Sequence, residues 1–86
     1  MLRVFADQNI PSADQALSPL GKVTLFNGRD LKREQLGECD ALVVRSVTKV
    51  NRKLLDGTPV RYVATATAGI EHVEQADLAA LGIVLA

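Results

Sequence analysis

Two adjacent residues, Arg45 and Ser46, follow an apolar run at residues 41–44 and indicate an anion-binding site. Arg45 offers a planar fork of N–H donors that suits a carboxylate or a phosphate, and Ser46 can donate a hydroxyl hydrogen bond. Thr67 follows another apolar stretch and offers a second hydroxyl, while Gly69 lets backbone amides approach a ligand closely. These residue types predict a site for a small phosphorylated or carboxylated metabolite.

Each of these residues also has a structural interpretation. Polar residues commonly follow strands because the chain turns there, and Ser46 and Thr67 could equally cap helices. Arg45 could form a salt bridge with Asp7, which follows the first apolar run. The residue types alone leave both interpretations open.

The other reactive side chains lack the neighbours that catalysis needs. His72 is the only histidine, and no nucleophile pattern or metal-ligand cluster surrounds it, so we expect a structural role at a helix end. Cys39 is predicted to be an inert, semi-buried thiol, and residues 32–34 a solvated helix face. The sequence contains no G-x-G-x-x-G, P-loop or paired-carboxylate motif. It therefore predicts a binding segment without catalytic residues and without a metal.

Apolar runs and turn residues alternate along the chain in a way that predicts a parallel α/β sheet with helices on both faces. The strands expected from these runs are residues 2–6, 22–26, 41–44, 60–65 and 83–85. Helices are expected after Pro11, ending at Pro19 and Gly21, and at residues 31–36, 51–55 and 71–81. The chain stops at its fifth strand, where a further helix would be due, so we expect a fragment of a longer protein.

This architecture predicts where the polar residues meet. Parallel strands end at a common edge, and in the order 2-1-3-4-5 the ligand crevice lies between the first and third strands. Asp7, Gln8 and Asn9 follow the first strand, whereas Arg45 and Ser46 follow the third. Residues 65–69 follow the fourth strand, and a helix starting near Glu71 is expected to point its positive end toward the same edge.

The composition excludes several classes of protein. Ten basic and ten acidic residues give a formal net charge of zero, which argues against a general nucleic-acid or membrane surface. A single cysteine excludes an internal disulfide, and no apolar run reaches membrane-spanning length. A cytoplasmic location is the simplest expectation.

Four stretches, "ADQNIP" (6–11), "ALVVRSVTKVN" (41–51), "VATATAGIEHV" (63–73) and "LAALGIVLA" (78–86), resemble the N-terminal segment of the D-2-hydroxyacid dehydrogenase family. The resemblance covers essentially the whole chain in the correct order. It implies that residues 1–86 are the N-terminal part of a substrate-binding domain with a flavodoxin-like sheet. The NAD-binding Rossmann domain, with the catalytic residues, would then lie outside this chain.

The resemblance also implies roles for individual residues. Ser46 and Thr67 fall on family positions that contact substrate, and Arg45 beside them is a candidate from its chemistry alone. The implied substrate is a small phosphorylated hydroxy acid, the cofactor is NAD, and the full-length protein is a homodimer. Two departures from the family pattern are Gln8, where Glu is usual, and residues 70–71, Ile-Glu in place of Thr-Asp.

Two other functions fit a small α/β domain. A receiver-like signalling module shares the sheet order 2-1-3-4-5 and carries acidic residues after its first strand. Receivers also have a phospho-accepting Asp at the end of the third strand, where this chain has Arg45 and Ser46. A non-catalytic regulatory domain that binds a small acid is the second alternative.

Overall fold

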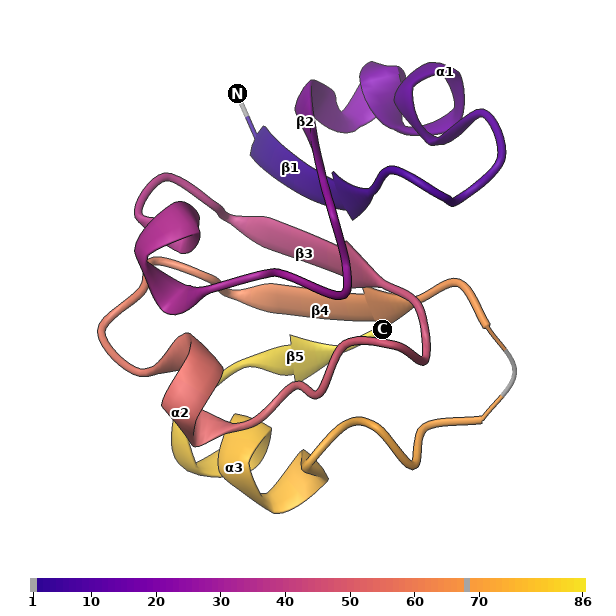
Figure 1. The fold of residues 1–86 in the computed structure, drawn as a ribbon. Coiled ribbons are helices and arrows are strands. Elements are labelled where there is room, and N and C mark those ends of the chain that lie inside the picture. Colours follow the sequence, from indigo (N-terminus) through magenta and orange to yellow (C-terminus); the bar gives the residue numbers. More distant parts are fainter. Residues whose placement is uncertain (1, 68) are drawn as a thin grey trace.

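A computed structural model describes residues 2–67 and 69–86, which form a five-stranded parallel sheet in the order β2-β1-β3-β4-β5 (Figure 1). The strands are β1 (Leu2–Asp7), β2 (Gly21–Phe26), β3 (Ala41–Val44), β4 (Tyr62–Thr65) and β5 (Val84–Leu85). Between them lie the α-helices α1 (Ala13–Leu17), α2 (Arg52–Leu55) and α3 (Gln75–Ala80), and the 3-10 helices η1 (Ser18–Leu20) and η2 (Arg33–Leu36). The predicted sheet and its order are confirmed.

The strand register explains the alternation of buried and exposed residues. Phe5 pairs with Leu42, Leu42 with Val63, and Val63 with Leu85, so one row of apolar side chains crosses β1, β3, β4 and β5. Successive side chains of a strand point to opposite faces, and these four residues therefore share a face. Leu42 and Val63 are fully buried on it, at the centre of the core.

Helices cover both faces of the sheet, as predicted. On the face of Leu42 and Val63, η2, α2 and α3 bury leucines that belong to the same core cluster: Leu36, Leu54, Leu55 and Leu78. On the other face α1 lies against β1 and β2 (Figure 1). Ala13 of α1 and Val4 and Ala6 of β1 are buried.

The prediction of one helix over residues 71–81 is wrong at its start, because α3 begins at Gln75. The residues before it form a turn, closed by the Val73 N–H donating to the Ile70 carbonyl at 2.9 Å, and a parallel bridge between Val50 and Val73. The Val50 N–H donates to the His72 carbonyl at 2.8 Å, and the Glu74 N–H donates to the Val50 carbonyl at 2.8 Å. These groups cannot also make helical hydrogen bonds, so His72 lies at no helix end and no helix N-terminus faces the strand ends from Glu71.

Two other predicted helices are shorter or tighter than expected. Residues 31–36 form a 3-10 helix over Arg33–Leu36 rather than an α-helix, anchored by the fully buried Leu36. The helix after Pro11 begins at Ala13, and Pro19 lies inside η1 instead of ending the helix, because a first 3-10 turn does not need the missing N–H. None of the helices in the described ranges is long and apolar enough to cross a membrane.

Candidate functional site

A cavity of about 120 Å³ opens at the carboxyl edge of the sheet, where the strand order reverses between β1 and β3. It is lined by residues that follow three different strands: Asn9, Ile10 and Pro11 after β1, Arg45 after β3, and Ala66 and Thr67 after β4. Parallel strands bring these loops together although they are far apart in the sequence. The cavity is smaller than the roughly 300–1,000 Å³ typical of a complete small-ligand pocket, so it matches one part of a larger site.

Arg45 is partly buried directly after β3 and lines the cavity. It makes no ion pair with any described residue; the single ion pair among residues 2–67 and 69–86 joins Arg3 to Asp40. The structure therefore does not contain the salt bridge between Arg45 and Asp7 that the sequence left open. A guanidinium at a cavity wall without a carboxylate partner is suited to bind an external anion.

Asp7 is fully buried and does not line the cavity, although it is the last residue of β1 and belongs to the predicted group of edge residues. Its Oδ1 accepts the Asn9 N–H at 2.8 Å, and its carbonyl accepts the Ile10 N–H at 3.1 Å. Both hydrogen bonds fix the turn that carries Asn9, Ile10 and Pro11 to the cavity. Asp7 thus supports the site by fixing this turn, without lining the cavity itself.

The other Asp7 oxygen, Oδ2, has no hydrogen-bond partner among the described residues and lies against Gly28. The Gly28 carbonyl accepts the hydroxyl of the buried Thr48 at 2.8 Å. Sequence reasoning missed Thr48, because nothing in its spacing from Gly28 reveals the contact. The Thr48 hydroxyl therefore holds the turn after β2 against the turn after β3, whereas the Asp7 carboxylate contacts Gly28 without a hydrogen bond.

Ser46 lies one residue beyond Arg45 in the turn after β3, which the Thr48 N–H closes by donating to the Arg45 carbonyl at 3.1 Å. Its side chain is exposed and stands outside the cavity lining. The structure brings Arg45 and Thr67 together at one cavity, and it does not bring Ser46 into that lining. A contact between Ser46 and substrate stays a prediction.

Thr67 lines the cavity, and its hydroxyl is also hydrogen-bonded to Thr65, which lies outside the lining. Its Oγ1 lies 3.2 Å from the Thr65 Oγ1, which in turn lies 3.0 Å from His72 Nε2. The Thr67 N–H also points to the Thr65 Oγ1 at 3.4 Å. Sequence reasoning treated His72 as a helix-end residue and missed this contact, because it depends on the turn at residues 70–73 and on the bridge between Val50 and Val73.

A larger hollow of about 330 Å³ lies between η2 and α2, away from the strand ends. It is lined by exposed side chains of the predicted solvated face, with Leu54 at its base; Lys32, Arg33, Glu34 and Lys53 stand around it. No buried polar side chain points into it from the described residues. We therefore assign the site to the smaller cavity, which has a positioned guanidinium and hydroxyl.

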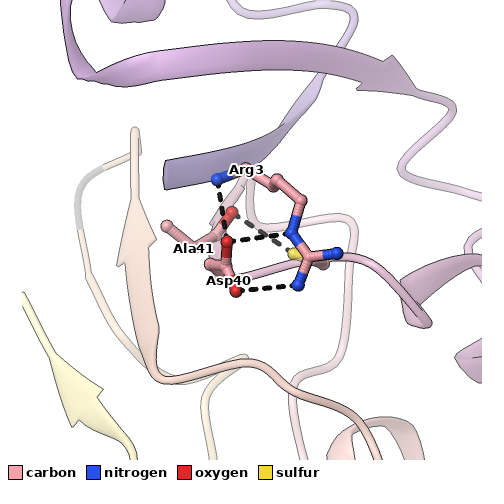
Figure 2. A network of polar contacts seen from close by, with 4 residues as sticks. Arg3, Asp40 and Ala41 are labelled. Carbon is pink, nitrogen blue, oxygen red and sulfur yellow. Dashed lines mark hydrogen bonds and ion pairs between the residues drawn. The ribbon is translucent and has the colours of Figure 1, made fainter. Parts of the chain in front are cut away.

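At the opposite, amino-terminal edge of the sheet, Arg3 and Asp40 form a two-point ion pair (Figure 2). Arg3 Nε donates to Asp40 Oδ2 at 3.0 Å and Nη2 donates to Oδ1 at 3.1 Å, while the Arg3 backbone N–H donates to Oδ2 at 2.9 Å. These hydrogen bonds lower the pKa of Asp40 to about 2. The pair ties β1 to the start of β3 and has no cavity around it suited to a substrate.

Cys39 is fully buried beside this ion pair, and its Sγ lies 3.3 Å from the Ala41 carbonyl (Figure 2). Burial raises the pKa of its thiol to about 12, so it is a thiol and not a thiolate near neutral pH. The prediction of an inert cysteine agrees with this environment. No group of three or more potential metal ligands occurs among the described residues.

Three kinds of comparison with known proteins agree with one another. Residues 4–86 match the family model described as D-isomer specific 2-hydroxyacid dehydrogenase, catalytic domain. Erythronate-4-phosphate dehydrogenases of Salmonella arizonae and Salmonella newport are each 49% identical over 82 residues, which is 95% of this chain. The chain spans only 22% of the length of these curated relatives.

Solved structures share the fold at low sequence identity. A Pyrococcus horikoshii protein superposes with a TM-score of 0.88 at 17% identity, over 99% of this chain and 27% of its own. The NAD+-bound 3-phosphoglycerate dehydrogenase of Entamoeba histolytica gives 0.76 at 19% identity, over 98% and 32%. The Aquifex aeolicus D-lactate dehydrogenase, complexed with NAD and lactic acid, gives 0.77 at 14% identity, over 96% and 26%.

Proposed function

The chain belongs to the D-isomer specific 2-hydroxyacid dehydrogenase family, and from this premise we propose that it is the N-terminal part of an erythronate-4-phosphate dehydrogenase. The proposed reaction oxidises the 2-hydroxyl of 4-phospho-D-erythronate and transfers the hydride to NAD. The similarity to the Salmonella enzymes over nearly the whole chain supports this substrate. We further propose a cytoplasmic homodimer that serves the synthesis of pyridoxal phosphate.

The observation that carries the proposal is the cavity between the ends of β1 and β3, with Arg45 and Thr67 on its wall. The substrate is an anion at both ends, as a carboxylate and a phosphate. The Arg45 guanidinium can donate two parallel hydrogen bonds to one of these ends, and the Thr67 hydroxyl can donate a third. We propose that Ser46, which is exposed in the same turn as Arg45, contacts a part of the substrate outside the cavity.

The residues of this chain do not fit NAD. The cavity of about 120 Å³ cannot enclose a dinucleotide, and the sequence has no glycine-rich phosphate-binding turn. In this proposal residues 1–86 bind and orient the substrate, and a Rossmann domain elsewhere in the full-length protein binds NAD and supplies the catalytic residues. When bound, NAD serves as the hydride acceptor.

The proposal is tested by steady-state kinetics of the full-length enzyme with 4-phospho-D-erythronate and NAD. Arg45→Gln should raise KM about 10- to 150-fold, because it removes hydrogen bonds to a charged group. Thr67→Val and Ser46→Ala should each raise KM about 2- to 10-fold, the effect of one neutral hydrogen bond. The value of kcat should change little, because these contacts exist before and during the reaction.

Thr24→Val is the matched control, since Thr24 is exposed on β2, outside the cavity lining. Unchanged KM and kcat in all three site variants would refute the site assignment. Absence of turnover by the unmodified enzyme would refute the substrate and favour the alternative, a regulatory domain that binds a small acid.

The receiver-like interpretation loses support from the position of Asp7. A phospho-accepting carboxylate must reach solvent, whereas Asp7 is fully buried with its Oδ2 against Gly28. Arg45 stands at the end of β3, where a receiver carries its acceptor aspartate. Family membership accounts for the shared sheet order without phosphotransfer.

A further inference from the structure

Three side chains are hydrogen-bonded in a row that leads from the cavity to the segment before α3. Thr67 lines the cavity, its Oγ1 lies 3.2 Å from the Thr65 Oγ1, and that oxygen lies 3.0 Å from His72 Nε2. All three residues are partly buried. The Thr65 hydroxyl has two lone pairs, and one of them already accepts the Thr67 N–H at 3.4 Å. Thr65 can therefore accept from only one of its two side-chain partners, and the row runs in one direction or the other.

The direction decides what Thr67 can offer to a ligand. If His72 Nε2 carries a hydrogen, it donates to Thr65, the Thr65 hydroxyl donates to Thr67, and the Thr67 hydrogen is left for the cavity. If Nε2 is bare, Thr65 donates to His72, Thr67 donates to Thr65, and Thr67 presents only lone pairs to the cavity. An anionic substrate needs the first arrangement, because its oxygens accept hydrogen bonds.

Backbone hydrogen bonds hold Thr65, the middle residue of the row, and His72, one of its ends, in place. Thr65 ends β4 and is paired with Val44 of β3. The carbonyl of His72 accepts the Val50 N–H at 2.8 Å, within the bridge between Val50 and Val73. The distance between the imidazole and the Thr65 hydroxyl is therefore set by two strand-like pairings and does not depend on a flexible loop.

We propose that His72 is a positioning residue for the substrate, which acts through Thr65 to keep the hydroxyl of Thr67 as a hydrogen-bond donor to the cavity. This inference rests on the proposed function. It assigns His72 and Thr65 a part in substrate affinity although neither lines the cavity. It also gives the only histidine of the sequence a role in binding without a role in the chemical step.

The kinetic test uses two pairs of variants in the full-length enzyme. Thr65→Val, which has nearly the same shape without a hydroxyl, should raise the KM for 4-phospho-D-erythronate about 2- to 10-fold, and Thr65→Ser should not. His72→Leu should raise KM by a similar factor, and His72→Gln, which keeps an N–H donor at the end of the side chain, should restore it. The value of kcat should stay within about twofold in all four variants, because a lost binding contact changes KM.

A double-mutant cycle separates positioning from a general structural defect. In a Thr67→Val background the hydroxyl at the end of the row is gone, so His72→Leu and Thr65→Val should have no further effect on KM. An undiminished effect of either substitution in that background would overturn the proposal. So would an unchanged KM in Thr65→Val and His72→Leu alone.

A measurement without substrate distinguishes failure of this inference from failure of the proposed function. The nitrogen chemical shifts of His72 in the unliganded full-length protein should show a hydrogen on Nε2, with the signal assigned by its loss in His72→Gln. That signal should move in Thr65→Val and stay in place in the control Thr24→Val. If Nε2 carries no hydrogen in the unmodified protein, the positioning role of His72 is refuted whether or not the enzyme oxidises 4-phospho-D-erythronate.

Discussion

At the scale of single residues, the exact position of a residue relative to its strand decides whether it lines the cavity, more than its residue type does. Arg45 and Thr67 both follow strands that end at the crevice, and both line the cavity. Ser46 has the same kind of side chain as Thr67, but it lies one residue further along its turn and outside the lining. Asp7 is the last residue of β1, yet its side chain is fully buried and outside the cavity lining.

The ion pair between Arg3 and Asp40 predicts a specific dependence of stability on pH. The pKa of Asp40 is lowered from 3.8 to about 2 in the folded chain, so the stabilisation is complete above pH 3.8 and is lost as the pH falls through about 2. Asp40→Asn should therefore lower the unfolding temperature at neutral pH. The difference from the unmodified chain should shrink between pH 4 and pH 2, as followed by circular dichroism.

Asp30→Asn is the control for this prediction, because Asp30 is exposed and forms no ion pair with the described residues. Its unfolding temperature should follow the unmodified chain across the whole pH range. An Asp40→Asn curve parallel to the unmodified one down to pH 2 would contradict the assignment.

At the scale of elements, turns and caps decide how the short helices and strands are fixed. In the turn after β2, Gly28 contacts the Asp7 carboxylate, and its carbonyl accepts the hydroxyl of Thr48. No helix is longer than six residues among those described, so helices of this length depend on packing and on caps. Sequence reasoning found the strands well because their apolar runs are local, but it began α3 too early, over residues that form a turn and a bridge to the distant Val50.

Gly28→Ala tests the packing of this turn. The added methyl carbon would overlap Asp7 Oδ2, which is buried and has little room to move, so we expect a loss of about 1–3 kcal/mol of folding stability. Gly37→Ala is the matched control, because nothing lies within 4 Å of the equivalent carbon at Gly37. Chemical denaturation of both variants measures the difference, and equal midpoints would contradict the close contact.

Substitution of Asn51 tests how much the N-cap of α2 contributes to folding stability. Its side chain accepts the Leu54 N–H at 3.0 Å at the start of α2, so Asn51→Ala should cost about 1 kcal/mol. Glu74 precedes α3 without a side-chain hydrogen bond to it, and Glu74→Ala should leave the free energy of unfolding nearly unchanged. A loss from Glu74→Ala as large as that from Asn51→Ala would show that capping does not account for the effect.

At the scale of the whole molecule, the chain is a parallel sheet with one binding edge and a cavity too small for a complete substrate and cofactor site. Its relatives are several times longer, since this chain spans 22% of their length. We propose a division of roles that agrees with this difference in size: these residues orient the substrate, and the remainder of the proposed enzyme carries out the oxidation.

The isolated chain should therefore show no dehydrogenase activity. Residues 1–86 mixed with NAD and 4-phospho-D-erythronate should give no NADH absorbance above the blank, because neither a dinucleotide site nor a catalytic residue is expected within them. The full-length enzyme at the same molar concentration is the positive control. Turnover by residues 1–86 alone would overturn the proposed division between binding and catalysis.

The sequence by itself determined the five strands, their parallel arrangement, the family, and the kinds of polar groups at the strand ends, because strand patterns and motifs are properties of neighbouring residues. Only the tertiary structure decided which of those groups meet. The choice of Thr67 over Ser46 for the cavity, the burial of Asp7 against Gly28 and the link from His72 through Thr65 depend on strand register and loop paths. These join residues far apart in the chain, and no local pattern of amino acids encodes them.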